Sequence, residues 1–503
     1  MDSALRCVAR RLTQSIYYYR PTDRNLLYSS LNQGSSLFLL MLLDNSSMAR
    51  VGRAIRAFTW LLVAAALLFS GTASALLDYD YERRPPHPSY PLGTVIAIDL
   101  GNTNSCAAGY APGHTESMFH LCIPSWVAFP DDGGVLVGED AMNYAAVNPD
   151  AAAFSGFKRL LGKRVNKLYE GGFVQTVIEN LPYKVVEKDV RPHIEMETKD
   201  GLVRHFSIEA ITTAVFAKLK DMAEAHLGHK VHHAVFTLPQ QYCSDAARSA
   251  VLHTGKDAGL HAMRILDEPI AAAVAYGLHG KLPDEGNVLV LHIGGGTAEA
   301  SVLTFANGVF EFLGGDLDPF LGGDDFDRNV MNYFIGLVRD KYGRDISNDT
   351  AALRKLRTAC EDAKKTLSDM DRAHVSVESL VGGVDLSEPL TRAKFEELNH
   401  DLFPKLVELL DMVMSEAELK KNKELVTEVI LIGGTTMIPK VRELVRDYFG
   451  GTKELNTKLK PDEAVTFGAT LLSHPTASGY PCMGVNSRHQ IGVQTDNCYA
   501  YDY

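Results

Sequence analysis

The stretch Thr94-Val-Ile-Ala-Ile-Asp-Leu-Gly-Asn-Thr-Asn-Ser105 joins an apolar, β-branched run to a glycine turn. A second stretch, Asn287-Val-Leu-Val-Leu-His-Ile-Gly-Gly-Gly-Thr-Ala-Glu299, repeats that order of features further along the chain. Such runs predict buried strands, and the glycines after them predict a sharp turn into a returning strand. A third run, Glu428-Val-Ile-Leu-Ile432, ends in Gly433-Gly-Thr-Thr-Met437 and precedes a helix that Pro439 can begin.

Glycine turns at strand ends suit phosphate binding. A backbone that points several N–H groups at phosphate oxygens cannot carry Cβ atoms in the way, and the hydroxyls of Thr103 and Thr297 add donors. An acidic residue at a strand end, as Asp99 is, can hold Mg²⁺ through its waters. One such turn alone is more simply a β-hairpin with a glycine bulge. Its repetition favours phosphate binding.

The repeated units also indicate the architecture. Two similar lobes with a nucleotide clamped between their turns describe the actin-like ATPase fold. This is an α/β fold in which each lobe has a mixed five-stranded sheet flanked by helices, with the nucleotide cleft between the lobes. The sequence contains no GxxxxGK(S/T), and no GxGxxG opens a helix, which excludes the P-loop and Rossmann alternatives.

Composition agrees with a globular protein that binds phosphate only locally. The 503 residues are 46% hydrophobic and 22% charged, which is enough for several domain-sized cores. The net charge of −12 argues against a nucleic-acid partner. The seven cysteines form no CxxC pair and no zinc spacing, and their odd number leaves at least one outside any intrachain disulfide.

The most apolar run of the chain, Phe58–Leu77, predicts a targeting segment. Counted from Met48, basic residues, an apolar stretch and the small residues Ala73-Ser-Ala75 follow in the order of a signal peptide over residues 48–75. Residues 1–47 are then an upstream gene-model extension, and 76–92 form a Pro-rich linker. The alternative is a single membrane anchor. We expect cleavage, and therefore no stable membrane insertion of the mature chain.

Further segments carry a resemblance to a known family. They include Ile123-Pro-Ser-Trp-Val-Ala-Phe129, Lys158-Arg-Leu-Leu-Gly162, Asp267-Glu-Pro-Ile-Ala-Ala-Ala-Val-Ala-Tyr-Gly277, Gly322-Gly-Asp-Asp-Phe-Asp327 and Lys460-Pro-Asp-Glu-Ala-Val465. With these, residues 93–472 resemble the nucleotide-binding (ATPase) domain of the heat shock protein 70 family, most closely its luminal branch in the endoplasmic reticulum. The resemblance implies a lobe I of about 93–281 plus 457–472 and a lobe II of about 282–456.

The same resemblance implies a function and partners. It predicts an ATP-binding chaperone-family protein of the endoplasmic reticulum lumen, active in protein folding and the unfolded-protein response. ATP or ADP and Mg²⁺ would be its cofactors. A J-domain co-chaperone and a nucleotide-exchange factor would be its partners.

By position, the resemblance also assigns site residues. Asp99 and Glu299 would lie around the metal's waters, while Lys158 would orient the attacking water beside Glu268. The phosphates would contact Gly101, Asn102, Thr103, Asn104, Gly294, Gly295, Gly296, Thr297 and Gly323. The nucleoside would contact Glu361, Lys364, Lys365, Ser368, Gly433, Gly434, Thr435, Met437 and Asp462. Without the resemblance, the charged residues from 361 to 365 would simply be a solvated helix face.

Five positions depart from the family pattern. His292 stands where the family has Asp, and a neutral imidazole brings no negative charge to metal-bound water. If that Asp is a proton acceptor, its loss costs about 10²–10⁴-fold in rate. Glu299 is one methylene longer than the usual Asp, Asn102 replaces Thr, and Lys365 and Met437 replace two Arg residues that flank the base. The pattern predicts nucleotide binding with weak or absent hydrolysis.

Residues 473–503 are expected to form an irregular tail without the family's peptide-binding domain, so client-peptide binding is not expected. The tail also lacks a KDEL-type signal, which leaves secretion as an alternative to lumenal residence. Two other functions stay open, an active but slow ATPase and a non-functional truncated paralogue.

Overall fold

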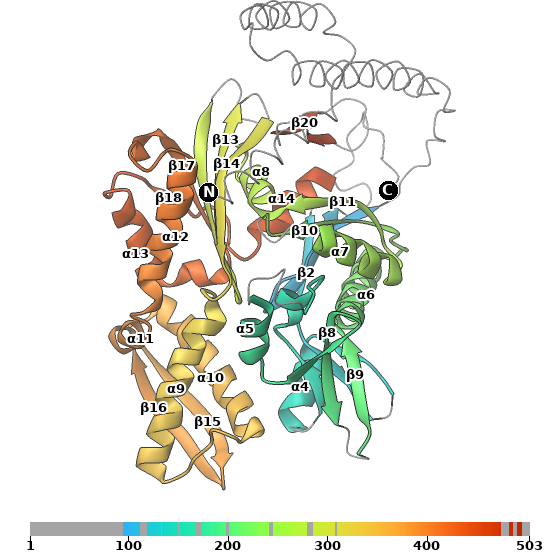
Figure 1. Cartoon of the computed structure of the whole chain (residues 1–503), viewed down its shortest axis with the longest axis vertical. Coiled ribbons are helices and arrows are strands. Elements are labelled where there is room, and N and C mark those ends of the chain that lie inside the picture. The colour runs from blue at the N-terminus through green and yellow to red at the C-terminus, as the bar shows by residue number, and fades with distance from the viewer. Residues whose placement is uncertain are drawn as a thin grey trace, which may run out of the picture. The chain divides into compact units, whose positions relative to one another are not determined.

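Two mixed sheets with matching strand orders form the framework of the chain (Figure 1). The computed structural model describes residues 94–110, 118–131, 133–148, 151–165, 173–197, 201–240, 245–278, 285–306, 309–473, 482–485 and 490–494. The expected extension (1–47), signal peptide (48–75) and linker (76–92) lie outside these ranges.

Lobe I contains the first sheet, the helices around it and two small sheets. Its elements are β1 (Val95–Asp99), β2 (Asn104–Tyr110), β3 (Met118–Pro124), β4 (Val127–Phe129), β5 (Leu136–Val137), α4 (Glu139–Val147), β6 (Ala152–Phe154), η2 (Phe157–Leu160), α5 (Phe173–Glu179), β7 (Lys184–Lys188), β8 (Arg191–Glu197), β9 (Val203–Ser207), α6 (Ile208–Leu227), β10 (His233–Leu238), α7 (Asp245–Asp257), β11 (His261–Asp267), α8 (Glu268–Ala275) and α14 (Ala464–Ser473).

Lobe II contains the second sheet and a long two-stranded hairpin. Its elements are β12 (Gly286–Ile293), β13 (Ala298–Ala306), β14 (Val309–Asp318), α9 (Gly323–Tyr342), α10 (Thr350–Asp369), β15 (Arg372–Val381), β16 (Val384–Thr391), α11 (Arg392–Leu398), α12 (Leu402–Glu416), η4 (Lys423–Leu425), β17 (Val426–Ile432), η5 (Gly434–Met437), α13 (Pro439–Tyr448), β18 (Leu455–Asn456), β19 (Cys482–Val485) and β20 (Gln490–Gln494).

The two sheets have the same topology. The lobe I order is β11-β10-β1-β2-β3, and the lobe II sheet contains the matching order β18-β17-β12-β13-β14. In each, the strand before the glycine turn pairs antiparallel with the strand after it and parallel with a later strand, β1 with β10 and β12 with β17. The expected two-lobed, actin-like α/β architecture is therefore confirmed.

The lobe II sheet departs from the expected five strands by two more. Strand β20 pairs antiparallel with Val309–Glu311 of β14, and β19 pairs with β20. The expectation of an irregular tail over 473–503 is therefore wrong for 482–485 and 490–494. Without β20, these residues of β14 would present unpaired N–H and C=O groups at a sheet edge, and such an edge accepts another strand.

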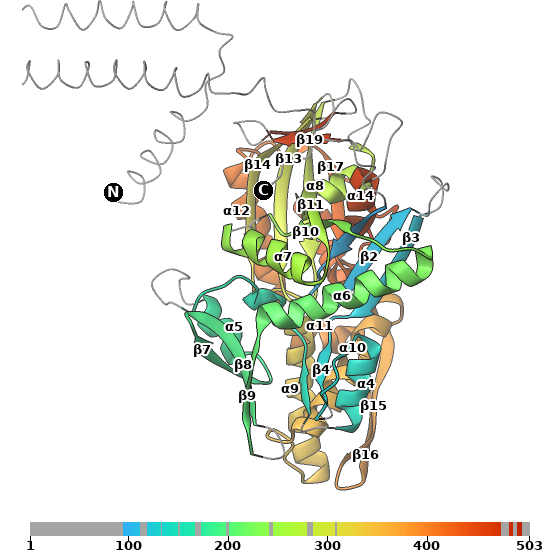
Figure 2. The ribbon, with the colours of Figure 1, turned by 90° about the vertical axis from the view of Figure 1, so that its right-hand side faces the viewer.

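The core strands are buried on both faces because each sheet lies between two apolar layers. In β1, Ile96 and Ile98 join the lobe I core, whereas Val95 and Ala97 point the other way and join a third cluster. Helix α6 covers one face of the lobe I sheet across β2 and β3 (Figure 2). The third cluster contains residues of α8 and α14 as well as β12 and β17, so it connects the cores of the two lobes.

Helix α14 crosses α8 at unusually short range. A Cβ atom on Gly468 of α14 would lie 1.8 Å from the carbonyl oxygen of Ala271 in α8. Both residues lie among buried neighbours, so the backbones have no room to separate. Position 468 requires glycine because no larger residue fits between the two helices.

A disulfide joins β2 to β3. Cys106 and Cys122 are direct cross-strand partners with their Cα atoms 4.1 Å apart, and a disulfide links them. Cys360 is a buried free thiol in α10. The sequence spacing gave no sign of the bridge, because cross-strand partners depend on the register of the two strands.

None of the helices in the described ranges combines the length and apolar character needed to cross a lipid bilayer. The apolar run Phe58–Leu77 lies outside those ranges.

The α8–α14 crossing predicts opposite effects for the same substitution at two helical glycines. Gly468→Ala should destabilise the full chain by about 1–3 kcal/mol or more, because the new methyl group overlaps the α8 backbone. Gly336→Ala, in α9, meets no atom within 4 Å and should stabilise the helix by about 0.5–1 kcal/mol. Urea-induced unfolding of both variants measures the difference. Equal effects at the two positions would contradict the proposed close contact.

Candidate functional site

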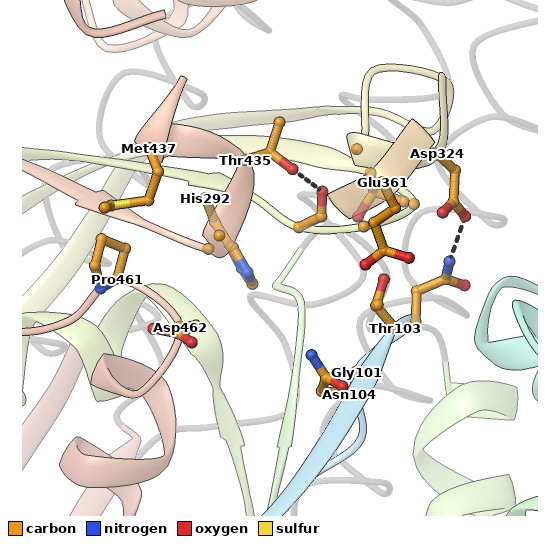
Figure 3. Close-up of a pocket in the computed structure, with 18 of the residues that line it drawn as sticks. Gly101, Thr103, Asn104, His292, Asp324, Glu361, Thr435, Met437, Pro461 and Asp462 are labelled. Atoms are coloured by element: carbon orange, nitrogen blue, oxygen red, sulfur yellow. Dashed lines mark hydrogen bonds between the residues drawn. The ribbon is translucent and has the colours of Figure 1, made fainter. Parts of the chain in front are cut away.

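A cavity of about 510 Å³ lies between the turns of the two lobes. Its wall comes from the β1–β2 and β12–β13 turns, η2, the start of α8, α10 and the segment around η5. In Figure 3, Met437, Pro461 and Asp462 gather at one side of it, and Thr103 and Glu361 lie on the other side of His292. Every residue predicted for the site lines this cavity except Glu299. Glu299 lies on β13, opposite His292 in register, and is buried.

The two phosphate-type turns face each other across the lobes. A Cβ atom on Gly295 would lie 1.9 Å from the hydroxyl oxygen of Thr103, so a larger residue would push the turns apart. Ser125, next to the end of β3, steadies the first turn, since its hydroxyl donates to the Gly101 carbonyl (2.8 Å) and its N–H donates to the Thr103 carbonyl (2.7 Å). The first turn is thereby held in place opposite the second.

A buried ion-pair network lies beside these turns. The Glu268 carboxylate is 0% exposed and begins α8. Its Oε1 lies 3.2 Å from Lys158 Nζ of lobe I, and its Oε2 lies 2.8 Å from His292 Nδ1 of lobe II. One carboxylate therefore holds a cationic group from each lobe.

The network shifts the pKa values of its members. Burial by itself would raise the pKa of Glu268, but the charges of Lys158 and His292 lower it to about 2. Burial likewise opposes protonation of His292, yet its bond to Glu268 and the charge of that carboxylate outweigh burial and raise the imidazole pKa. His292 is thus biased toward the protonated, cationic form, which the sequence alone did not indicate.

Asp99 lies at the carboxyl end of β1, on the cavity wall. Thr237 of β10 donates its hydroxyl to Asp99 Oδ1 at 2.6 Å. Burial and then the nearby Glu268 charge raise the pKa of Asp99, and Lys158 only partly offsets them. Asp99 is therefore a better proton acceptor than an ordinary surface carboxylate.

Among the described residues that line the cavity near Met437, none is an arginine. Lys365 Nζ is 2.8 Å from Glu361 Oε1 in an i,i+4 pair, as the solvated-face alternative anticipated. Arg442 of α13 donates to the Met437 sulfur at 2.9 Å and to the Thr436 carbonyl at 2.9 Å. Sequence reasoning missed Arg442, because it becomes a neighbour of Met437 only through the turn into α13.

Lys364 is engaged inside the protein. Its Nζ lies 2.6 Å from Asp327 Oδ2 and donates to the Gly323 carbonyl at 3.1 Å. Burial raises the pKa of Asp327 to about 6, although the Lys364 charge opposes this shift. Lys364 therefore fixes the start of α9 against α10, at the edge of the cavity.

Two residues of lobe I make contacts to lobe II that the sequence did not indicate. Asn102 in the first turn donates its amide to Asp324 Oδ2 at 2.9 Å, and Arg357 lies 3.0 Å from the other oxygen of that carboxylate. Arg159, almost fully buried, donates to the carbonyls of Gly296 and Pro319. Contacts between residues so far apart in the sequence leave no pattern in either segment, because neither residue requires a particular residue type next to it.

Two lobes of equal topology, with glycine turns facing across a cavity, define a nucleotide-binding protein of the actin-like ATPase class. The Hsp70 protein family model matches residues 95–478. The chain is also 47% identical over 382 residues to the heat shock 70 kDa protein BIP3 of Oryza sativa subsp. japonica, a match that covers 75% of this chain and 56% of that relative. The chain belongs to the heat shock protein 70 family, whose members use ATP and ADP with Mg²⁺.

The buried network predicts a large and pH-dependent effect of Glu268→Gln. At pH 7 this variant should lose about 3–5 kcal/mol of unfolding free energy, because the half-buried Lys158 and His292 keep no counter-charge at the buried Glu268 position. The folded-state pKa of Glu268, about 2, lies below its ordinary value of 4.5. Its contribution is therefore full above pH 4.5 and is lost as the pH falls toward 2, so the difference between the variants should shrink over that window.

Urea-induced unfolding from pH 7 to pH 2 tests this expectation. Glu397→Gln, which breaks an exposed pair with Lys394, is the matched control and should change stability by no more than about 1 kcal/mol. A Glu268→Gln effect as small as the control's would contradict the network.

Proposed function

We propose that this chain is an ATP-binding heat shock protein 70 family protein of the endoplasmic reticulum lumen in which ATP hydrolysis is weak or absent. The observation that carries the proposal is the ion pair of His292 with Glu268 on the cavity wall. The glycine turns and threonine hydroxyls suited to binding phosphate are retained. In contrast, His292 stands where the family has the carboxylate suited to accepting a proton.

Nucleotide binding depends mainly on groups that the substitutions leave in place. The glycine turns offer backbone N–H groups, and Thr103 and Thr297 add hydroxyls on the cavity wall. Backbone donors act on phosphate whatever the neighbouring side chains are. ATP or ADP would therefore place its phosphates between the turns and its base toward Met437 and Asp462.

Hydrolysis needs a group that takes a proton from the attacking water. A general base must be deprotonated and have an acceptor free to face the water. The imidazole of His292 is biased toward its protonated form, and its Nδ1 faces Glu268. Lys158 would still orient a water, but its ammonium group is held on Glu268. We therefore expect the rate of hydrolysis to be reduced more than nucleotide affinity.

The fit of the site to Mg²⁺ is mixed. Oxygen donors suit this ion, and Asp99 and Glu299 offer carboxylates that would hold it through its waters. The His292 nitrogen is a poor partner for Mg²⁺, and it stands on the neighbouring strand directly opposite Glu299. Only the carboxylate part of the site matches the family's metal.

Compartment and partners follow from family membership and from the expected signal peptide. We propose a lumenal protein that meets a J-domain co-chaperone and a nucleotide-exchange factor. The chain spans about half the length of the curated relative it matches, and client-peptide binding by this chain is not part of the proposal.

A slow but active ATPase is the second candidate, and Asp99 favours it. The pKa of this carboxylate is raised by burial and by Glu268, which makes it a stronger base than usual. With Lys158 and Glu299 also present, Asp99 would supply the proton acceptor that His292 does not.

The proposal predicts that His292→Asp raises ATP hydrolysis more than it changes ATP affinity. A carboxylate at this position restores a proton acceptor, which is worth up to about 10²–10⁴-fold in rate. Affinity should improve by no more than about 10–100-fold, as for other groups that support a metal. Single-turnover hydrolysis and Mg-ATP titration of the full chain measure the two effects.

The matched control is His374→Asp, the same change at an exposed position of β15. It should alter neither quantity. The proposal fails if His292→Asp hydrolyses no faster than the natural chain, or if the natural chain already turns over at the rate of an intact family member.

The base side of the cavity yields a separate prediction. Met437→Arg should tighten ATP binding by about 2–30-fold, since a guanidinium over the base adds about 0.5–2 kcal/mol of stacking and cation–π attraction. Inorganic triphosphate, which has no base, should bind both proteins equally. If triphosphate gains as much affinity as ATP, the added charge acts on the phosphates and the base does not lie at Met437.

A further inference from the structure

A short turn joins α9 to α10 and contains the sequence Asn348-Asp-Thr350. This is an Asn-x-Thr sequon, the pattern that accepts an N-linked glycan when the middle residue is not proline. The chain contains one other Asn-x-Ser/Thr sequence, Asn45-Ser-Ser47, which lies outside the described residues and before Met48, where the expected signal peptide begins. Residues 48–503 therefore contain a single sequon.

The turn holds Asn348 at a fixed place on the surface. Ile346 is buried in the lobe II core, which anchors the turn two residues before the sequon. Asp349 caps α10, because its carboxylate accepts a hydrogen bond from the N–H of Ala352 at 2.9 Å. Asn348 and Thr350, on either side of this cap, are both exposed. The two side chains that define the sequon are therefore accessible, while the residue between them stabilises the helix.

The surroundings of the turn have room for an oligosaccharide. A glycan is bulky and hydrophilic, so a folded protein accommodates it only where the asparagine faces solvent. The turn lies beside the tip of the β15–β16 hairpin, since a Cβ atom on Gly382 would lie 3.9 Å from the guanidinium of Arg344. The helices α9 and α10 and this hairpin form the lower end of lobe II in Figure 1. A glycan on Asn348 would cover that end of the lobe.

The sequon lies at the opposite end of both helices from the cavity. Asp327 near the start of α9 and Asp369 at the end of α10 line the cavity, whereas the turn follows the end of α9 and precedes the start of α10. A helix rises about 1.5 Å per residue, so Asp327 and Tyr342 are separated by about 20 Å along α9. A glycan on Asn348 therefore leaves the cavity open to a nucleotide.

We propose that Asn348 is a site of N-linked glycosylation. The inference rests on the proposed function in one respect, because the reaction takes place in the endoplasmic reticulum lumen. The co-reactants are an oligosaccharide linked to a lipid diphosphate and a membrane-bound transferase of that compartment. Nδ2 of Asn348 forms a bond to the anomeric carbon of the first sugar, and the bond from that carbon to the diphosphate oxygen breaks. The lipid diphosphate leaves with the electron pair, and Nδ2 gives up one proton to solvent.

Expression of the full chain in a eukaryotic secretory cell tests the proposal, with the protein's mass measured before and after treatment with peptide N-glycosidase. The natural chain should lose the mass of one oligosaccharide on treatment. Asn348→Gln and Thr350→Ala should lose none, although both keep the Asp349 cap. Thr350→Ser retains the hydroxyl of the sequon, so it is the matched control and should still carry the glycan. A glycosidase-sensitive mass that persists in Asn348→Gln overturns the assignment.

A second sequon separates the site from the compartment. Glu424→Thr gives Asn422 the Asn-x-Thr pattern, and both positions are exposed. Combined with Asn348→Gln, this change should restore one glycan if the chain enters the lumen. A natural chain without a glycan, together with a modified Asn422 in this variant, refutes the Asn348 site and leaves the lumenal location standing. If neither asparagine is modified, the chain does not reach the lumen, and both the location and this inference are wrong.

Discussion

A carboxylate without solvent exposure needs positive charge beside it, and Glu268 obtains that charge from both lobes. Lys158 comes from a short helical turn of lobe I and His292 from a central strand of lobe II. The position of α8 is therefore tied to both sheets at once. The close crossing of α8 with α14 and the apolar cluster shared by the lobes add to this connection. The cavity exists because these contacts hold the two turns face to face.

The proposed function separates nucleotide binding from the hydrolysis step. Phosphate binding is spread over many backbone N–H groups, and these do not change when a side chain does. Proton transfer depends on the charge and orientation of one or two atoms, so a single replacement such as His292 can alter it. Under the proposed function, this chain keeps the fold and the cleft of its family while the reaction in that cleft is weakened.

Contacts between distant segments account for most of what sequence reasoning missed. The family pattern indicates a lost hydroxyl at Asn102, yet the Asn102 amide donates to Asp324 and links the lobes. The cross-strand disulfide of Cys106 with Cys122 and the contact of Arg442 with Met437 also depend on register or on a turn. The added strands β19 and β20 come from a segment with little periodicity, and an open sheet edge rather than their own pattern places them.

Local sequence patterns were sufficient to predict the strands, the glycine turns and the duplication of lobes, because alternation, β-branching and glycine act over a few neighbouring residues. The sequence also indicated which residues line the cavity, through the family motifs that contain them. The tertiary structure alone decided the state of His292. Its partner Glu268 belongs to the other lobe, and the bond to that carboxylate and its charge outweigh burial and raise the imidazole pKa. The charge state of an imidazole depends on the groups around it, and Glu268 lies beside His292 only when the two lobes have folded and packed together.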